Sequence, residues 1–349
     1  MNRQIALESR KVFHDLNVFV RIETPWPDAR RHVNQEGYVP IIAWGKPAAA
    51  YTGYGMRVGI DAPEVPLNEG DEQVFLTLLE DLPAFCKMWF YSSLSHPGLN
   101  PQLRLTIDLQ DRRERVPKSL QRKLLLPFGI VKSLRSVLVT GTPAPDPTVV
   151  ADLEALQAVP LASPESCLRE GTRLKAAGNA ELVAGNYARA LELYNEAWLA
   201  IHVVVKGRRR HDHADAFFAS HTLTEAPYTG KNGQSERLIL RVQLVANTCQ
   251  VYLKQQDYEE CIFWGMRSIG MLRMAMGLDE RRDVSPEDEA MLGFPAANEM
   301  GKIYYRVAVA KRDTGDKDGA RKLLRVAVVY LPRDQNVRGV LASVALALG

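Results

Sequence analysis

Three stretches of equal length decide the fold of the C-terminal half of this chain. They are GTRLKAAGNAELVAGNYARALELYNEAWLAIHVV (171–204), VQLVANTCQVYLKQQDYEECIFWGMRSIGMLRMA (242–275) and GKIYYRVAVAKRDTGDKDGARKLLRVAVVYLPRD (301–334). Each has 34 residues, a length typical of two helices joined by a turn. One such pair cannot bury its apolar face alone, so the three pairs are expected to stack on one another.

The three stretches share small residues at matching places. Places 7, 8, 20 and 27 hold Ala177, Gly178, Ala190 and Ala197, then Thr248, Cys249, Cys261 and Ser268, then Val307, Ala308, Ala320 and Ala327. Two antiparallel helices approach closely only where their side chains are small. The pairs Gly185-Asn186 and Gly315-Asp316 predict the turn after the first helix, because Gly with Asn or Asp suits a helix end.

With Pro332 at place 32 of the last stretch, this pattern resembles the tetratricopeptide (TPR) family. The resemblance implies an all-α, three-repeat superhelix spanning residues 171–349. Residues 205–241 and 276–300 are predicted to be insertions whose middles project as loops, with IHVVV (201–205) extending a helix. The tail Val337–Leu348 is predicted to be a helix that caps the stack.

Five polar residues on the first helices of the repeats point to a ligand. They are Lys175, Asn179, Asn247, Lys302 and Arg306. The two pairs Lys175/Asn179 and Lys302/Arg306 are each four residues apart, so both members share one helix face. In a TPR superhelix these first helices line the concave groove. A surface so rich in donors suits two closely placed carboxylates, as at the end of a peptide that terminates in aspartate.

The five residues resemble the dicarboxylate clamp of heat-shock co-chaperones, through KAAGN (175–179), Asn247 and KIYYR (302–306). The resemblance implies that they hold the C-terminal Glu-Glu-Val-Asp tail of the seventy- and ninety-kilodalton heat-shock chaperones. The alternative is that each residue is a solvated or capping side chain. The two insertions could also cover the groove.

Residues 1–150 do not continue the repeat and predict a compact α/β or α+β domain. Strands are expected at Val18–Ile22, Met56–Ile60, Leu103–Leu109 and Arg135–Thr140, and helices at Glu72–Tyr91 and Lys118–Leu126. Residues 151–170 are expected to form a linker or helix. The run IVKSLRSVLVTG (130–141) resembles the α/β region that follows an F-box in fungal proteins. The opening residues read like the middle of a domain, which suggests a piece of a longer protein.

Composition excludes several classes of function. The chain carries 44 basic and 41 acidic residues, a net charge of +3, which gives no reason to expect a nucleic acid or a membrane surface as partner. No segment is apolar enough to span a membrane. The four cysteines lack CxxC spacing and are expected to be reduced thiols, in the cytoplasm or also the nucleus.

Enzyme signatures are weak. The glycines of YTGYGMRVGI (51–60) miss the dinucleotide fingerprint by one place. His211, Asp212, His213 and Asp215 are close in sequence but have no distant partners of metal-ligand type, so a solvated insertion is favoured. We therefore expect no catalytic residues, metal or cofactor.

Two functions remain open from the sequence. The first is an interaction module, a co-chaperone-like adaptor whose N-terminal domain engages an unknown partner. The second is a ubiquitin-ligase substrate receptor, or an enzyme whose activity lies in residues 1–150, with the repeats as a scaffold. The second would place a deep pocket with perturbed titratable groups in the N-terminal domain.

Overall fold

A computed structural model describes the chain at residue 8 and at residues 17–64, 73–110, 117–142, 144–278 and 284–346. The chain divides into two compact units, 1–161 and 162–349. Across the described residues, no helix combines the length and the apolar character needed to cross a bilayer. Each unit has its own elements and its own buried side chains.

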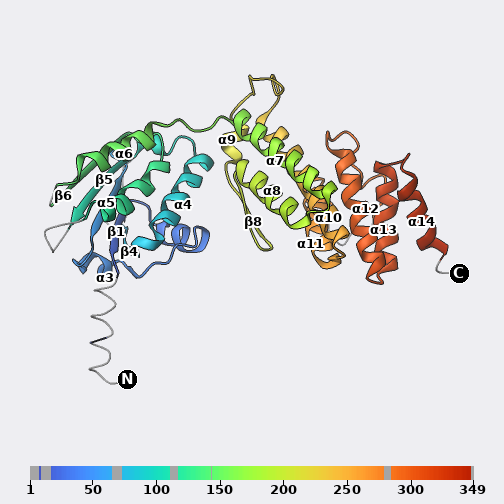
Figure 1. Cartoon of the computed structure of the whole chain (residues 1–349), viewed down its shortest axis with the longest axis horizontal. Helices are drawn as coiled ribbons and strands as arrows, with labels where there is room; N and C mark the ends of the chain where they lie inside the picture. The colour runs from blue at the N-terminus through green and yellow to red at the C-terminus, as the bar shows by residue number, and fades with distance from the viewer. Residues whose placement is uncertain are drawn as a thin grey trace. The chain divides into compact units, whose positions relative to one another are not determined.

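The N-terminal unit is an α/β region with one mixed sheet (Figure 1). Its strands are β1 (Phe19–Thr24), β2 (Ala43–Trp44), β3 (Met56–Asp61), β4 (Gln73–Leu78), β5 (Arg104–Gln110) and β6 (Ser136–Thr142). Its helices are α2 (Ala29–Arg31), α3 (Lys46–Ala50), α4 (Leu82–Ser95), α5 (Lys118–Leu125) and α6 (Pro147–Ala158), with short turns of other helix types between them.

The sheet has the strand order β2-β4-β1-β3-β5-β6. The pairs β1–β3 and β5–β6 are parallel, and the pairs β1–β4, β2–β4 and β3–β5 are antiparallel. Val58 of β3 lies opposite Ile107 of β5, and both are fully buried. They share one apolar core with side chains of α4, α5 and α6, such as Phe85, Leu124 and Leu153. Strands β1, β3, β5 and β6 lie where the sequence predicts strands.

The predicted helix Glu72–Tyr91 is wrong in its first half, because Gln73–Leu78 is strand β4. The apolar residues at 74, 78, 79 and 82 fit a helical spacing, but β4 lies between β2 and β1, with Phe75 and Thr77 fully buried. The helix starts only at Leu82, where Pro83 occupies the first turn, a position that suits proline because no backbone donor is needed there.

The predicted domain boundary at 150 is also too early. Helix α6 places Val149 and Leu153 in the N-terminal core, and its first turn is capped by Asp146, whose side chain accepts from the amide of Thr148 at 2.8 Å. Residues 151–170 are therefore not a linker throughout. Their last part opens α7, which begins at Pro164 rather than at 171.

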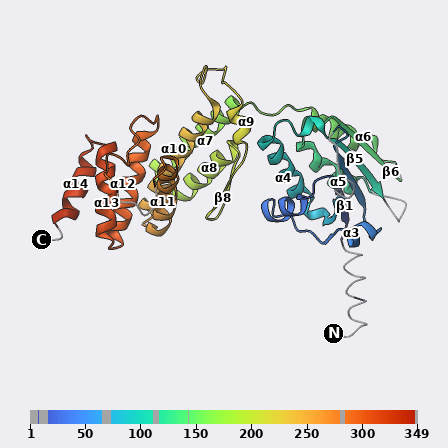
Figure 2. The same ribbon diagram turned by 180° about the vertical axis from the view of Figure 1, so that it is seen from behind.

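The C-terminal unit is helical (Figure 2). Its elements are α7 (Pro164–Ala184), α8 (Tyr187–Ala200), β7 (Val203–Lys206), β8 (Arg209–Asp212), α9 (Asp215–Ala219), α10 (Gly233–Lys254), α11 (Tyr258–Ala275), α12 (Ala297–Asp313), α13 (Lys317–Tyr330) and α14 (Gln335–Leu346). Helix α7 packs on α8, α10 on α11 and α12 on α13, and each pair also contacts the next. This arrangement is TPR-like.

The helix ends follow the predicted turn chemistry. Gly185 and Gly315 both adopt the left-handed backbone, with φ of 84° and 95°, at the end of α7 and after α12. The next helix, α13, is capped by Asp316, whose side chain accepts from the amide of Gly319 at 2.8 Å. A glycine in the left-handed region carries no steric cost, so α7 and α12 can end at these turns.

Small residues let the helices approach, as the repeat pattern predicts. The twentieth places of the three stretches, Ala190, Cys261 and Ala320, are fully buried. At Gly178 a Cβ atom would lie 2.5 Å from the ring of Tyr194 in α8. At Gly265, where a larger residue is usual in such repeats, a Cβ atom would lie 2.1 Å from Val307 of α12. That irregular glycine therefore permits the contact between two successive helix pairs.

The first insertion differs from its prediction. Residues 201–205 do not extend α8, because α8 ends at Ala200 and β7 begins at Val203. The 205–241 segment contains most of the β7–β8 hairpin, all of α9 and the start of α10. In the 276–300 segment the described residues form turns and loops as far as 296, residues 297–300 begin α12, and residues 279–283 lie outside the described residues. Helix α14 occupies most of the predicted cap at 337–348, whose last two residues also lie outside.

Candidate functional site

Helix α7 supplies Lys175 and Asn179 one turn apart on the same face. The carboxamide oxygen of Asn179 accepts a hydrogen bond from the hydroxyl of Tyr194 at 2.8 Å. Because Gly178 brings α8 close, Tyr194 can reach this oxygen. The contact fixes how the Asn179 amide is turned.

Helix α10 supplies Asn247, whose Nδ2 donates to the same oxygen of Asn179 at 2.6 Å. Two of the predicted residues, on helices 68 positions apart in sequence, therefore touch directly. The Asn179 oxygen already accepts two bonds, so the hydrogen-bonding capacity that this side chain can offer a ligand lies in its NH₂ group.

Lys175 also reaches α10, where its Nζ donates to the carboxamide oxygen of Gln243. Gln243 lies four residues before Asn247 and so shares its helix face. Burial lowers the pKa of Lys175, against a smaller opposing effect from the negative charge of Glu299. Such a lowered pKa means that the surroundings disfavour the positive charge, and an incoming carboxylate would reverse this effect.

Helix α12 supplies Lys302 and Arg306. Arg306 donates from Nη1 to the backbone oxygen of Ala246 at 2.5 Å, which ties α12 to α10. Burial is the main cause that lowers the pKa of Arg306. The Nζ of Lys302 lies 3.6 Å from Oε1 of Glu299, one turn earlier on the same helix.

The structure thus brings four of the five predicted residues onto one segment of α10. Residues 243–247 of α10 contact Lys175 and Asn179 on one side and Arg306 on the other. Lys302 is connected to them through Glu299, whose charge also acts on Lys175. All five side chains are half-buried.

Three neighbours of the site were missed from the sequence: Tyr194, Gln243 and Glu299. Gln243 could have been found, because it precedes the predicted Asn247 by one helical turn. Glu299 could have been found in the same way, as the residue three before Lys302. Tyr194 contacts Asn179 across a helix pair, and neither spacing nor charge marks that contact in the sequence.

The side chains of His211, Asp212, His213 and Asp215, which are close in sequence, contact other groups in the structure. The rings of His211 and His213 stack, with centroids 6.4 Å apart, and Asp212 instead pairs with Arg241 at 2.6 Å. Asp215 pairs with Arg237. In the ranges that the structure describes, no three His, Cys, Asp or Glu side chains gather as a metal site would need.

The β7–β8 hairpin and α9 surround Arg237, a fully buried cation on α10. Its Nε donates to the backbone oxygen of Ile201 at 2.9 Å, its Nη2 to the oxygen of His213, and its Nη1 to Asp215 at 2.5 Å. A buried guanidinium is tolerated only when its donors are satisfied in this way. Arg237 therefore has a structural role in the first insertion.

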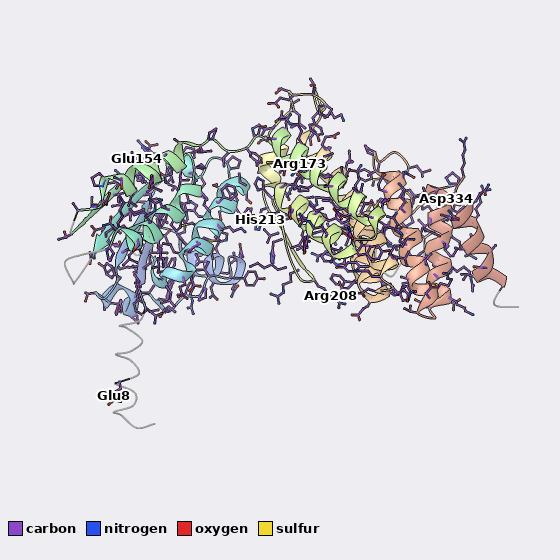
Figure 3. The ribbon with its side chains drawn as sticks, in the orientation of Figure 1. Glu8, Glu154, Arg173, Arg208, His213 and Asp334 are labelled. Atoms are coloured by element: carbon purple, nitrogen blue, oxygen red, sulfur yellow. The ribbon has the colours of Figure 1, made fainter. Side chains whose placement is uncertain are left out.

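The tip of the hairpin lies on α11. Arg208, labelled in Figure 3, pairs with Glu259 and with Glu260 at 2.6 Å, and its guanidinium lies 4.9 Å from the ring centroid of Phe263. Arg267 of α11 donates to the backbone oxygen of Arg208 at 3.0 Å. Arg208 at this tip therefore contacts the protein's own helix α11.

A separate cavity of about 680 Å³ lies between α11, α13 and residues 284–289. Its apolar lining includes Ile269, Leu323 and Val326, and the ion pair Arg273–Glu289 at 2.6 Å lies at its wall. None of the five predicted residues lines it.

All four cysteines, Cys86, Cys167, Cys249 and Cys261, are buried and none forms a disulfide. Burial raises the pKa of Cys86 and, to about 11, that of Cys167. A thiol held in this protonated state is a poor nucleophile, so Cys86 and Cys167 act as small apolar side chains.

Comparison with known proteins adds little to this geometry. Neither a family model nor a curated protein matches the chain. One solved structure, the C-terminal TPR-containing domain of an FK506-binding protein of Plasmodium falciparum, is similar at 16% identity and a TM-score of 0.34. The alignment covers 54% of this chain and 93% of that domain.

Proposed function

We propose that the C-terminal unit is a protein-interaction module that binds the acidic C-terminal end of a peptide. The residues in contact would be Lys175, Asn179, Asn247, Lys302 and Arg306. The partner implied by the co-chaperone resemblance is the Glu-Glu-Val-Asp tail of a heat-shock chaperone, in the cytoplasm or nucleus. With such a partner, the chain would act as an adaptor.

The observation that supports the proposal best is the gathering of donors from three helices at residues 243–247 of α10. Asn179 and Asn247 touch at 2.6 Å, and Arg306 reaches the backbone of Ala246 at 2.5 Å. Lys175 is partly desolvated at the same place. A partly desolvated cation or carboxamide is stabilised when a carboxylate replaces the water that it has lost.

The expected affinity is moderate. Hydrogen bonds to charged groups contribute about 1.5–3 kcal/mol each, less the entropy of ordering the peptide. Several such bonds are consistent with a micromolar dissociation constant, about −8 kcal/mol. The existing bonds of Lys175 to Gln243 and of Arg306 to Ala246 keep these donors in place before the ligand arrives.

The test compares two charge reversals. Lys302→Glu should weaken binding of a peptide ending in Glu-Glu-Val-Asp by about tenfold or more, because it puts a negative charge beside the ligand carboxylates. Arg173→Glu is the control. Arg173, labelled in Figure 3, lies two residues before Lys175 and so projects from the other side of α7. Its exposed side chain pairs with Glu170 at 2.7 Å.

Fluorescence anisotropy with a labelled peptide measures both variants, and circular dichroism checks that they fold. If the Arg173→Glu chain loses as much affinity as the Lys302→Glu chain, binding depends on overall charge and the proposed site is wrong. An activity or a ubiquitin-ligase role of the N-terminal unit stays a prediction from the sequence.

A further inference from the structure

Glu299 places a carboxylate of the protein itself among the cations of the proposed site. It lies in the first turn of α12, and its side chain is only 23% exposed. Its Oε1 is 3.6 Å from Nζ of Lys302, and its negative charge also acts on the ammonium of Lys175. One internal carboxylate therefore lies beside Lys302 and acts electrostatically on Lys175.

A ligand carboxylate needs the same ammonium groups. To bind Lys302 closely, it must share Nζ with Glu299 or displace it, and it approaches Glu299 as a like charge at short range. The separation of the pair in this structure, 3.6 Å, is longer than a close charge-assisted hydrogen bond. Glu299 thus weakens the site without closing it.

We propose that Glu299 is an autoinhibitory carboxylate that competes with the peptide for Lys302 and Lys175; this inference rests on the proposed function. It also sets the charge that the site accepts. Lys175, Lys302 and Arg306 carry three positive charges, and Glu299 neutralises one of them. The remaining two match the pair of carboxylates on the terminal aspartate of the peptide, so Glu299 limits the gain that further negative charge on the ligand brings.

The experiment measures binding of the peptide ending in Glu-Glu-Val-Asp by calorimetry to three full chains: wild type, Glu299→Gln and Asp313→Asn. Glutamine keeps the size of Glu299 but removes its charge. Asp313 is the control, since it lies at the other end of α12 and pairs with Arg312 at 2.7 Å. Removing its charge changes the net charge of the protein equally.

Glu299→Gln should bind the peptide about threefold to tenfold tighter, the order expected when one carboxylate acts on two partly exposed lysines. Asp313→Asn should bind like the wild type. The gain should shrink when Glu299→Gln is combined with Lys302→Gln, and should also shrink in high salt.

The outcomes separate the two claims. If the wild type binds and Glu299→Gln binds equally or more weakly, this inference is overturned while the proposed function stands. An equal gain in Asp313→Asn also overturns it, because the effect would then be one of net charge. If none of the three chains binds the peptide, the proposed function fails and the inference fails with it.

Discussion

At the scale of single residues, close contacts between helices in the helical unit depend on glycine, which has no Cβ atom. Gly265 of α11 faces Val307 of α12, and a Cβ atom there would also lie 3.4 Å from Cys249 and Ile303. Val307 and Cys249 are fully buried and cannot move into open space. The small residue at this place is therefore required by the neighbouring helix pair.

Gly265→Ala should lower the free energy of unfolding of the helical unit by about 1–3 kcal/mol, because the added methyl group overpacks this contact. Gly339→Ala on α14 is the matched control. Nothing lies within 4 Å of its would-be Cβ atom, so alanine should be neutral or stabilise by about 0.5–1 kcal/mol through its better helix propensity. Urea unfolding followed by circular dichroism measures both. Equal effects of the two substitutions would show that Gly265 is not tightly packed.

At the scale of elements, two histidines at the first insertion, His202 and His213, have lowered pKa values. Burial, aided by the charge of Arg237, lowers the pKa of His202 to about 4. Burial also lowers the pKa of His213 to about 4. The backbone oxygens of both histidines accept hydrogen bonds from the guanidinium of Arg237. A protonated ring would add a second positive charge beside this cation, so the neutral ring is favoured.

These shifts predict a loss of stability in acid. Below about pH 6.5 an unfolded histidine binds a proton, whereas the folded one stays neutral until about pH 4, so stability falls as the pH drops through this window. The slope is at most about 1.4 kcal/mol per pH unit for each histidine. Hydrogen exchange of α7 and α10 amides between pH 7 and pH 4 measures it.

His202→Asn should make that slope smaller. Asparagine does not titrate, and it tolerates the left-handed backbone at this position, where φ is 58°. His221→Asn, at an exposed site in the same unit, is the control. An unchanged slope in the His202→Asn chain would mean that His202 does not contribute to the acid sensitivity.

Helices were easier to predict than the segments between them. The repeat period and the small residues predict the packing of α7 to α13, because those signals are local and recur. Strand β4 was missed since its apolar residues fit both a helix and a buried strand. The β7–β8 hairpin was missed because its tip depends on contacts such as Arg208–Glu260, 52 residues apart in sequence. The five polar residues could be proposed from their spacing in the sequence. Gln243 and Glu299 lie at helical spacing from two of them, but their effect on Lys175 depends on how α7, α10 and α12 pack in the folded chain.

At the scale of the whole molecule, the chain combines an α/β unit with a helical unit, and the proposed activity lies in the second. The division at 161/162 falls after α6, whose Leu153 is fully buried in the first core. The proposed site is built within α7, α10 and α12 alone. Binding should therefore depend on the helical unit and on the charge of its ligand.

The most direct test of that claim is calorimetry of the wild-type chain with one peptide in two forms, ending in Glu-Glu-Val-Asp as the free acid or as the C-terminal amide. We predict micromolar binding of the free acid and a loss of about tenfold or more for the amide, because amidation removes one of the two carboxylates that the cations hold. Equal affinity for the two forms, or no binding of either to the folded chain, would contradict it.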